Sequence, residues 1–185
     1  QNIANATERL TQVVDTLTGL ARFDDRLTYA FEAVSLRELV DESLRKHGAA
    51  VKERGITFTI DVDPRVPRLV IDRQKIQFVT DVLLDNAIRY SPRGGEVTVG
   101  VGYEENAVTL AVADRGIGLT RRERRGLFKS FLRGERARAA DPEGMGLSLP
   151  LVQTVVRNPG GSVRASSEGK NRGSTFIIRL PIAQR

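Results

Sequence analysis

The first residues of the chain carry apolar side chains at alternating steps of three and four, a spacing typical of a helix that packs against other helices. These positions are Ile3, Ala6, Leu10, Val13, Leu17 and Leu20. The pattern ends near Asp24 and Asp25. Residues 1–30 are therefore either an amphipathic helix that lies on its own domain or, as the regular spacing favours, one arm of a helical hairpin or dimer bundle followed by a linker.

A second helix and the first strand are predicted next. Ser35 is a suitable N-cap, because a glutamate stands three residues later and an apolar set follows. This helix is expected to end near Gly55. Apolar and polar residues alternate over 56–62, which predicts a half-buried strand, and a short apolar run at 69–71 precedes a helix over 72–90.

The second half of the chain is predicted to add two pairs of strands and one helix. The strands cover 96–103, 107–113, 162–166 and 174–180, and the helix covers 145–157. This order predicts an α+β fold, a two-layer α/β sandwich in which a mixed, largely antiparallel sheet of about five strands carries helices on one face. The predicted N-terminal helix precedes this sandwich. The face of the sheet without helices is expected to meet solvent or a partner.

Composition narrows the class of protein. The 185 residues, of which 40% are hydrophobic and 28% charged, fit one globular domain with a small appendage and exclude a fully disordered chain. With no cysteine and one histidine, disulfide scaffolds, thiolate chemistry and multi-histidine metal sites are excluded. The net charge of +6 favours an anionic partner. No stretch suits a membrane span or a signal peptide, and the missing initiator methionine indicates a piece of a longer protein.

The helix predicted over 72–90 carries polar residues suited to a charged ligand. Asn86, Arg89 and Tyr90 stand among apolar residues that face inward. The amide oxygen of Asn86 suits Mg²⁺, which keeps several waters and takes phosphate oxygens as further ligands. Arg89 lies on nearly the same face, within reach of those phosphates. Taken by itself, the segment favours a helix that simply ends in a polar surface.

Two glycine-containing segments suggest a site for a flat ligand with phosphates. Asp114 follows an apolar strand, and its carboxylate can accept a hydrogen bond from an exocyclic amine. Gly116 and Gly118 allow the backbone to turn tightly beside such a ligand. Gly144 and Gly146 open a helix whose free N–H groups and dipole favour a phosphate. In isolation, each segment is also compatible with an ordinary glycine turn.

The stretch between these segments is arginine-rich and contains few core residues. Phe128 and Phe131 are suited to anchor its start, and residues 134–142 form either a lid or a surface loop. The basic cluster at 121–125 is a solvated helix face, a contact for phosphates or a contact for an acidic partner. Nucleic acid binding is not expected, because no aromatic residue interleaves with these arginines.

In their order and spacing, these segments resemble the ATP-binding catalytic domain of sensor histidine kinases, within the superfamily that includes gyrase, Hsp90 and the mismatch-repair ATPase. The resemblance covers residues 35–181 and includes Gly173-Ser174-Thr175-Phe176. It implies a Bergerat fold that binds ATP and Mg²⁺, with Asn86 as the metal ligand. The residues that it implies for ATP binding are Asn86, Arg89, Tyr90, Asp114, Gly116, Gly118, Phe128, Phe131, Arg133, Gly144, Gly146, Leu147 and Thr175.

The resemblance also implies a division of the chain and a set of partners. Residues 1–30 would be the second helix of a dimerisation hairpin, and residues 31–185 the ATP-binding domain of a protein-histidine kinase. The hairpin helix with the phosphoacceptor histidine is absent from the chain, so autophosphorylation is not expected. His47 does not fit that role, since the family's acceptor precedes an acidic residue. Implied partners are that hairpin, a response regulator receiver domain and a second copy of the full protein. The domain is expected in the cytoplasm, with a parent protein that is either free or anchored to a membrane.

Two residues depart from the family pattern. Val82 stands where the family usually has an amide or acid one helical turn before Asn86, which leaves the Mg²⁺ site one ligand poorer unless Asp81 or Asp85 rotates in. Pro142 replaces a glycine at the start of the phosphate segment and lacks an N–H group. These departures keep open an alternative function, a degenerate nucleotide-binding module that regulates a partner without phosphotransfer.

Overall fold

The computed structural model describes residues 30–158 and 160–182, so the predicted N-terminal helix lies outside the described residues. The first elements are β1 (Phe31–Val34), α2 (Leu36–Lys46), α3 (Gly48–Arg54), β2 (Thr57–Val62), β3 (Leu69–Asp72) and α4 (Arg73–Tyr90). The elements that follow are β4 (Glu96–Glu104), β5 (Ala107–Asp114), α5 (Arg121–Gly126), α6 (Glu135–Ala140), α7 (Ser148–Arg157), β6 (Ser162–Ser166) and β7 (Ser174–Pro181).

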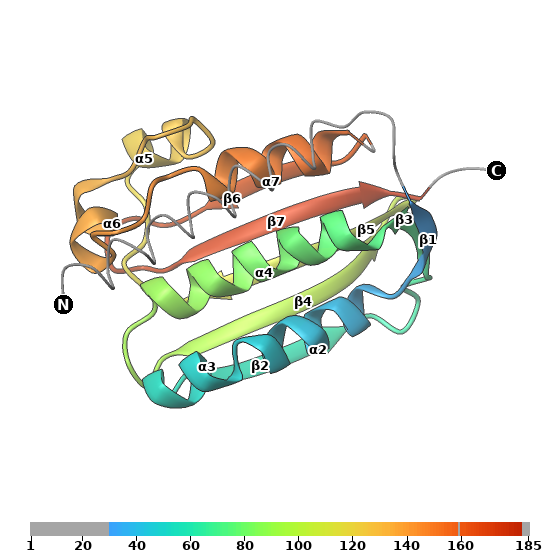
Figure 1. The fold of residues 1–185 in the computed structure, drawn as a ribbon, viewed down its shortest axis with the longest axis horizontal. Helices are drawn as coiled ribbons and strands as arrows, with labels where there is room; N and C mark the ends of the chain where they lie inside the picture. Colours follow the sequence, from blue (N-terminus) through green and yellow to red (C-terminus); the bar gives the residue numbers. More distant parts are fainter. Residues whose placement is uncertain (1–29, 159, 183–185) are drawn as a thin grey trace, which may run out of the picture.

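A five-stranded sheet forms the centre of the fold, with the strand order β2-β4-β5-β7-β6. The β2–β4 pair is parallel and the remaining pairs are antiparallel. Helices α2, α3, α4 and α7 cover one face, while α5 and α6 lie at one end (Figure 1). This architecture confirms the predicted two-layer α/β sandwich with a mixed sheet.

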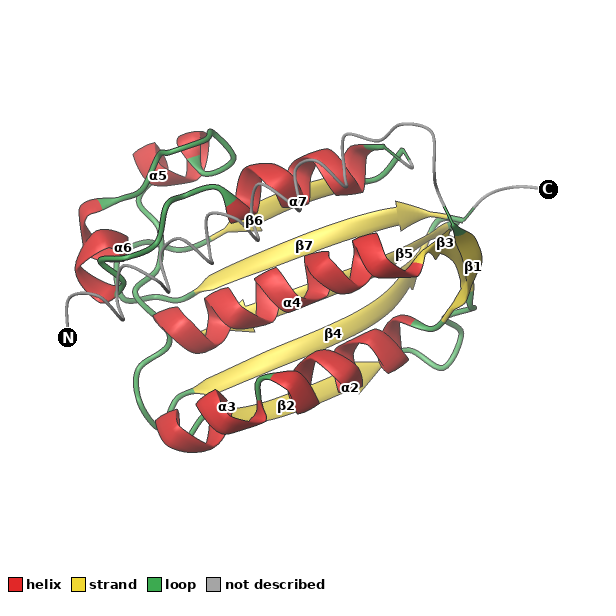
Figure 2. Cartoon of the chain, in the orientation of Figure 1, coloured by secondary structure: helices red, strands yellow, loops and turns green. Residues whose placement is uncertain are grey.

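Three local features differ from the sequence-based expectation. β1 pairs antiparallel with β3 in a separate two-stranded sheet at the end of the fold away from α6 (Figure 2). The single helix predicted from Ser35 to Gly55 is two helices, because the backbone leaves helical geometry at His47 (φ −88°, ψ 6°). The arginine-rich stretch contains the short helices α5 and α6. Short elements such as these carry too few residues for a periodic signal.

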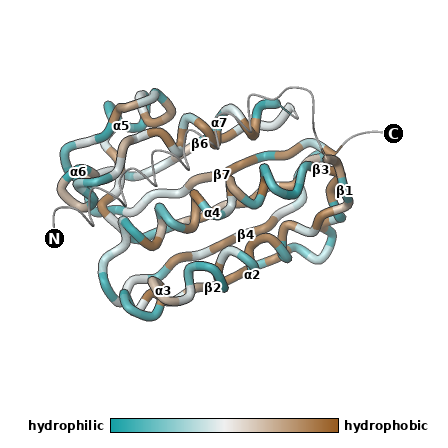
Figure 3. The backbone as a smooth tube through the Cα atoms, viewed as in Figure 1, coloured by the Kyte–Doolittle hydropathy of each residue, from teal (hydrophilic) through white to brown (hydrophobic). Residues whose placement is uncertain are grey.

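The core lies between the helical layer and the sheet. Val79, Leu83 and Leu84 of α4 are fully buried, as are Val97 and Val99 of β4. Burying each such side chain stabilises the fold by about 1.5–3 kcal/mol. Hydrophobic and hydrophilic positions alternate around α2, α4 and α7, as an amphipathic layer requires (Figure 3). Among the described residues, no helix is long and apolar enough to cross a membrane.

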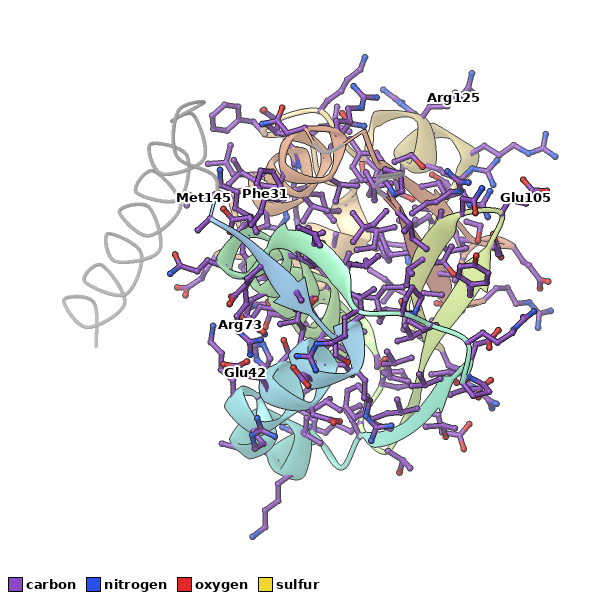
Figure 4. The ribbon with its side chains drawn as sticks, turned by 90° about the vertical axis from the view of Figure 1, so that its right-hand side faces the viewer. Phe31, Glu42, Arg73, Glu105, Arg125 and Met145 are labelled. Carbon is purple, nitrogen blue, oxygen red and sulfur yellow. The ribbon has the colours of Figure 1, made fainter. Side chains whose placement is uncertain are left out.

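Polar contacts fix α2 against the neighbouring helix α4. Asp81 accepts hydrogen bonds from Ser43 Oγ (2.5 Å), Lys46 Nζ (2.6 Å) and Gln77 Nε2 (3.1 Å). Burial raises the pKa of Asp81, but these donors outweigh it and hold the pKa below its usual value. Nearby, Arg73 and Glu42 point toward each other (Figure 4) and form an ion pair of 2.7 Å. The helix that carries Asn86 is therefore held rigidly.

Candidate functional site

A cavity of about 320 Å³ opens at the end of the sheet beside α5 and α6. Its wall combines the last turns of α4, Asp114 with residues 117–119, parts of 123–141, residues 144–149 and the start of β7. The predicted ATP-binding residues that line it are Asn86, Arg89, Tyr90, Asp114, Gly118, Arg133, Gly144, Gly146 and Leu147. The fold thus gathers segments from four of the sequence motifs around one hollow.

The C-terminal turns of α4 supply one wall of the cavity. Ala87 and Ile88 are buried, whereas the residues on either side of this pair line the cavity: Asp85, Asn86, Arg89 and Tyr90. Arg89 Nη2 lies 2.9 Å from Asp85 Oδ2. Nδ2 of Asn86 is buried and has no hydrogen-bond partner among the described residues. A buried polar atom without a partner costs about 1–3 kcal/mol. This atom is an N–H donor, so a metal ion would have to bind the amide through Oδ1.

Asp114 stands at the end of β5, where the register places it opposite Ser174 of β7. Its Oδ1 accepts hydrogen bonds from the backbone N–H groups of Gly116 (2.7 Å) and Ser174 (3.2 Å). Oδ2 accepts no hydrogen bond from the described residues. Burial raises the pKa of Asp114 to about 6, although the two backbone donors oppose the shift. Asp114 is therefore a fixed acceptor on the cavity wall, ionised at neutral pH.

Gly116 does not line the cavity but fixes the loop that does. A Cβ atom at this position would lie 2.2 Å from the carbonyl oxygen of Tyr90, so no larger residue fits without a backbone shift. The Ile117 N–H donates to that same oxygen at 3.3 Å. Gly118 has a left-handed φ of +65° and closely approaches the backbone of Gly169. The two glycines thus let the loop pack tightly against α4 and against the loop before β7.

Another part of the cavity wall is rich in groups that bind anions. Arg89 and Arg133 both line it, together with Gly144, Gly146 and Leu147 at the start of α7. Gly146 has a φ of +71°, which favours glycine. A Cβ atom on Gly144 would lie 2.3 Å from Asp141 Oδ2 and 2.8 Å from Arg133 Cζ. Two guanidinium groups beside a glycine-opened helix suit a phosphate chain.

Phe128, Phe131 and Thr175 are predicted binding residues that the cavity wall does not include. Phe131 has a left-handed φ of 63° and is 72% exposed. In β7, successive side chains point to opposite faces of the sheet, so Ser174 and Phe176 line the cavity and Thr175 does not.

Sequence reasoning also missed part of the wall. The additional lining residues include Asp85, Ile117, Leu119, Glu123, Leu127, Leu132, Asp141, Met145, Ser148, Leu149, Ser174 and Phe176. The alternation of β7 could have identified Ser174 and Phe176, because they are in phase with the buried Ile178 and Leu180. No sequence signal distinguishes Asp141, which follows a short helix and reaches the cavity through its tertiary contacts.

Residues near Asn86 offer few further metal ligands. Val82 packs against the core and does not line the cavity. Asp81 is held by α2, so it is not available to the site. Asp85 does line the cavity. The described part of the chain contains no group of three or more His, Asp or Glu side chains that could hold a metal ion by itself.

The basic cluster lies outside this cavity on α5. Thr120 and Glu123 form a capping box that starts the helix, with Thr120 Oγ1 accepting from the Glu123 N–H at 3.2 Å. Arg121 and Arg124 are exposed, and Arg122 and Arg125 line a second, adjoining hollow between α5 and α6. Arg125 projects away from the body of the protein (Figure 4). None of these four arginines reaches the cavity that Asn86 and Asp114 line.

Comparison with known proteins places this site in a family. Residues 71–184 match the family described as histidine kinase-, DNA gyrase B-, and HSP90-like ATPase. The sensor histidine kinase WalK of Bacillus subtilis is 33% identical over 96% of this chain, which spans 29% of that relative's length. Across eight curated relatives that match, the chain spans between 29% and 49% of their lengths.

Solved structures share the fold. The histidine kinase AdeS of Acinetobacter baumannii superimposes with a TM-score of 0.79 at 23% identity, covering 99% of this chain and 83% of that one. The histidine kinase ThkA, solved in complex with the response regulator protein TrrA, gives a TM-score of 0.77 at 19% identity, covering 96% and 49%. These matches confirm the predicted fold and resemblance. The chain therefore belongs to the family of histidine kinase-, DNA gyrase B- and HSP90-like ATPases, in the branch formed by the catalytic domains of sensor histidine kinases.

Proposed function

We propose that the chain binds ATP in the cavity and transfers its γ-phosphoryl group to a histidine on a dimerisation hairpin. The observation that carries this proposal is the arrangement of the cavity itself. A half-buried carboxylate, Asp114, lies on its wall with Oδ2 free to accept from an adenine amine. Asn86, Arg89 and Arg133 line the same wall and suit a charged tail. Apolar side chains such as Ile117 and Met145 complete the surface against which a purine can pack.

The residues present fit one Mg²⁺ ion held jointly with the nucleotide. Asn86 lines the cavity with a side-chain amide whose Oδ1 could bind the ion, and Asp85 stands next to it on the cavity wall. Two protein ligands are enough, because Mg²⁺ takes its remaining positions from water and phosphate oxygens. When bound, the ion would neutralise charge on the phosphates. The chain's own task is to position: Asp114 orients the base, and Arg89 and Arg133 orient the phosphates.

Calorimetric titration with ATP, in the presence and absence of Mg²⁺, tests the binding step. We expect tighter binding with Mg²⁺ in the native chain and no such gain in Asn86→Ala. Transfer is then tested by offering radiolabelled ATP and a separate hairpin from the parent protein that bears the histidine. Label on this hairpin, absent when its histidine is replaced by glutamine, supports the kinase. Binding without transfer would favour the regulatory module instead, which no present observation favours.

We further propose a response regulator receiver domain as the partner of the parent protein, acting in the cytoplasm where ATP is available. The structural neighbour ThkA, whose solved complex contains the response regulator TrrA, supports this kind of partner. Dimerisation through residues 1–30 remains part of the same proposal. Size-exclusion chromatography with light scattering, with and without residues 1–30, measures that contribution: a monomer in both cases contradicts it.

A further inference from the structure

The carboxylate of Asp141 lies between the two arginines at the phosphate end of the cavity. Its Oδ2 is 3.2 Å from Arg133 Nη2, and its Oδ1 is 3.4 Å from Arg89 Nη1. The Gly144 N–H donates to Oδ1 at 3.2 Å. The side chains of Asp141 and Arg133 are only 11% and 9% exposed, so this ion pair is shielded from solvent. Asp141 thus interacts with two guanidinium groups and a backbone donor of the glycine segment.

Arg133 joins these contacts to the chain that surrounds the cavity mouth. Its Nη2 donates to the carbonyl oxygens of Ala137 (2.8 Å) and Asp141 (2.6 Å), and Nη1 donates to the carbonyl oxygen of Gly144. Nη2 also lies 3.3 Å from the Tyr90 hydroxyl on α4. One guanidinium therefore ties α6, the glycine segment and α4 together, with the Asp141 carboxylate as its charged partner.

A phosphate group uses the same donors as a carboxylate. Arginine binds both anions through paired N–H groups, and a free N–H at a glycine segment binds either. Two anions cannot share these donors at low cost, because like charges about 4 Å apart in a partly buried site repel by several kcal/mol. We propose that Asp141 is an internal counter-anion that occupies the phosphate-binding donors and must be displaced by the terminal phosphates of a nucleotide. This inference rests on the proposed function.

Displacement of the Asp141 carboxylate by phosphate has consequences for ligand selectivity and for product release. A ligand without phosphates, such as adenosine, leaves the Asp141 contacts in place. A triphosphate places more negative charge at Arg89 and Arg133 than a diphosphate and competes better for them. After phosphoryl transfer, Asp141 can return to the vacated donors, which favours release of the diphosphate. Asp141 is thus a specificity-determining residue that acts through the arginines and not through direct contact with the reacting atoms.

The variant Asp141→Asn tests this inference, because it removes the charge and keeps an oxygen that can accept from the Gly144 N–H. We expect the Kd for ATP to fall about tenfold and the Kd for ADP to fall less, while the Kd for adenosine stays within twofold. Asp141→Glu retains the charge and should bind ATP within about threefold of the native chain. Glu135→Gln, in the same segment but outside the cavity wall, controls for the change in net charge.

Tripolyphosphate, which lacks the base, separates this inference from the proposed function. Tighter binding of tripolyphosphate to Asp141→Asn, with no ATP preference over tripolyphosphate in any variant, would support the counter-anion and overturn the adenine site. Unchanged or weaker ATP binding in Asp141→Asn, in a protein whose circular dichroism matches the native chain, overturns the inference. So does an equal gain for adenosine, because it would show a general opening of the cavity and no competition with phosphate.

Discussion

At the scale of single residues, Asp114 couples the cavity to pH. Burial raises its pKa from 3.8 to about 6. Between about pH 4 and pH 6, the Asp114 carboxyl group is therefore protonated in the folded chain but ionised in the unfolded chain. Below about pH 4 both states are protonated. As the pH rises from 4 to 6, the folded state loses stability relative to the unfolded state, and above pH 6 the full penalty remains. A shift of this size corresponds to about 3 kcal/mol.

Asp114→Asn should remove this penalty. We expect the variant to unfold at higher denaturant concentration than the native chain at pH 7, by about 2–3 kcal/mol, and to lose that advantage near pH 4. Urea titrations at both pH values provide the measurement. Asp61→Asn, an exposed position on β2, is the matched control and should leave stability unchanged. Equal stability of Asp114→Asn and the native chain at pH 7 would show that the buried charge carries no penalty.

Ligand binding should show the opposite dependence on pH. The ionised carboxylate is a stronger acceptor for an adenine amine than the protonated one, so the affinity for adenosine should rise as the pH increases through about 6. Adenosine is the appropriate probe, because it has no phosphates that titrate in this range. Calorimetry from pH 5 to 8 should give a flat, weaker profile for Asp114→Asn, lower by about 1–3 kcal/mol at pH 8. A pH-independent Kd in the native chain contradicts the assigned role.

Gly116 shows how tightly the loop after β5 packs. A methyl group at this position would overlap the carbonyl group of Tyr90, which belongs to the end of α4 and moves only with the helix. We expect Gly116→Ala to destabilise the fold by about 3 kcal/mol, measured by thermal denaturation. Gly48→Ala is the control, since nothing lies within 4 Å of its Cβ and its helical position favours alanine by up to about 1 kcal/mol. Similar melting temperatures for both variants would argue against the close packing.

The residues that sequence reasoning found and those that it missed differ in a physical way. Asn86, Asp114 and Gly118 stand at the ends of strongly periodic elements, where a polar or glycine residue breaks the apolar pattern. Thr175 stays a prediction that the cavity wall does not include, because alternate side chains of β7 point to opposite faces of the sheet. Asp141 acquires its position from contacts with Arg133, eight residues earlier, and with Arg89, which is distant along the chain. No periodic pattern of the sequence reports such contacts.

At the scale of elements, α4 divides its polar residues between two tasks. Asp81 faces α2 and holds the helix in place, whereas Asp85 and Asn86 line the cavity. The periodic pattern predicted this helix well, since its apolar stripe is long. It did not predict that the Asp81 carboxylate faces α2 while the Asp85 carboxylate lines the cavity, because this difference depends on where α2 packs. The break between α2 and α3 escaped prediction for a similar reason, because both helices carry compatible patterns across His47.

Removing the Asp81 contacts should therefore affect stability and not binding. We expect Asp81→Ala to lower the free energy of unfolding by about 1–3 kcal/mol, since Ser43 and Gln77 lose a buried partner. Because hydrogen bonds hold the pKa of Asp81 low, this difference should shrink as the pH falls below about 4. The Kd for ATP in the folded variant should match the native value. A large loss of Mg²⁺-dependent affinity would instead make Asp81 a participant in the metal site.

At the scale of the whole molecule, the positive charge is concentrated beside the cavity. Residues 121–138 contain seven arginines, one lysine and two glutamates, a net charge of +6 that equals the formal charge of the entire chain. The remaining sequence is therefore neutral on balance. Arg121, Arg122, Arg124 and Arg125 extend from α5 without lining the cavity. A one-sided charge of this kind attracts anions over about a Debye length, roughly 8–10 Å, without binding them directly.

This asymmetric charge distribution should affect the association rate of ATP more than its dissociation rate. Replacing Arg121, Arg122, Arg124 and Arg125 by glutamine lowers the net charge from +6 to +2. In stopped-flow experiments with a fluorescent ATP analogue, we expect the association rate to fall about tenfold at low salt and less than twofold at high salt, with an unchanged dissociation rate.

A control variant that loses four positive charges elsewhere on the protein distinguishes the effect of the α5 arginines on ATP association from the effect of net charge. Arg45, Lys52, Arg157 and Arg164 are exposed, and their replacement by glutamine also gives +2. Because the charges removed in this control lie outside the basic segment beside the cavity, association should slow by less than about twofold. Equal slowing in both variants would show that net charge alone matters. A faster dissociation rate in the α5 variant would show instead that these arginines reach the bound phosphates, and the cavity would then have to close further around a nucleotide than it does in this structure.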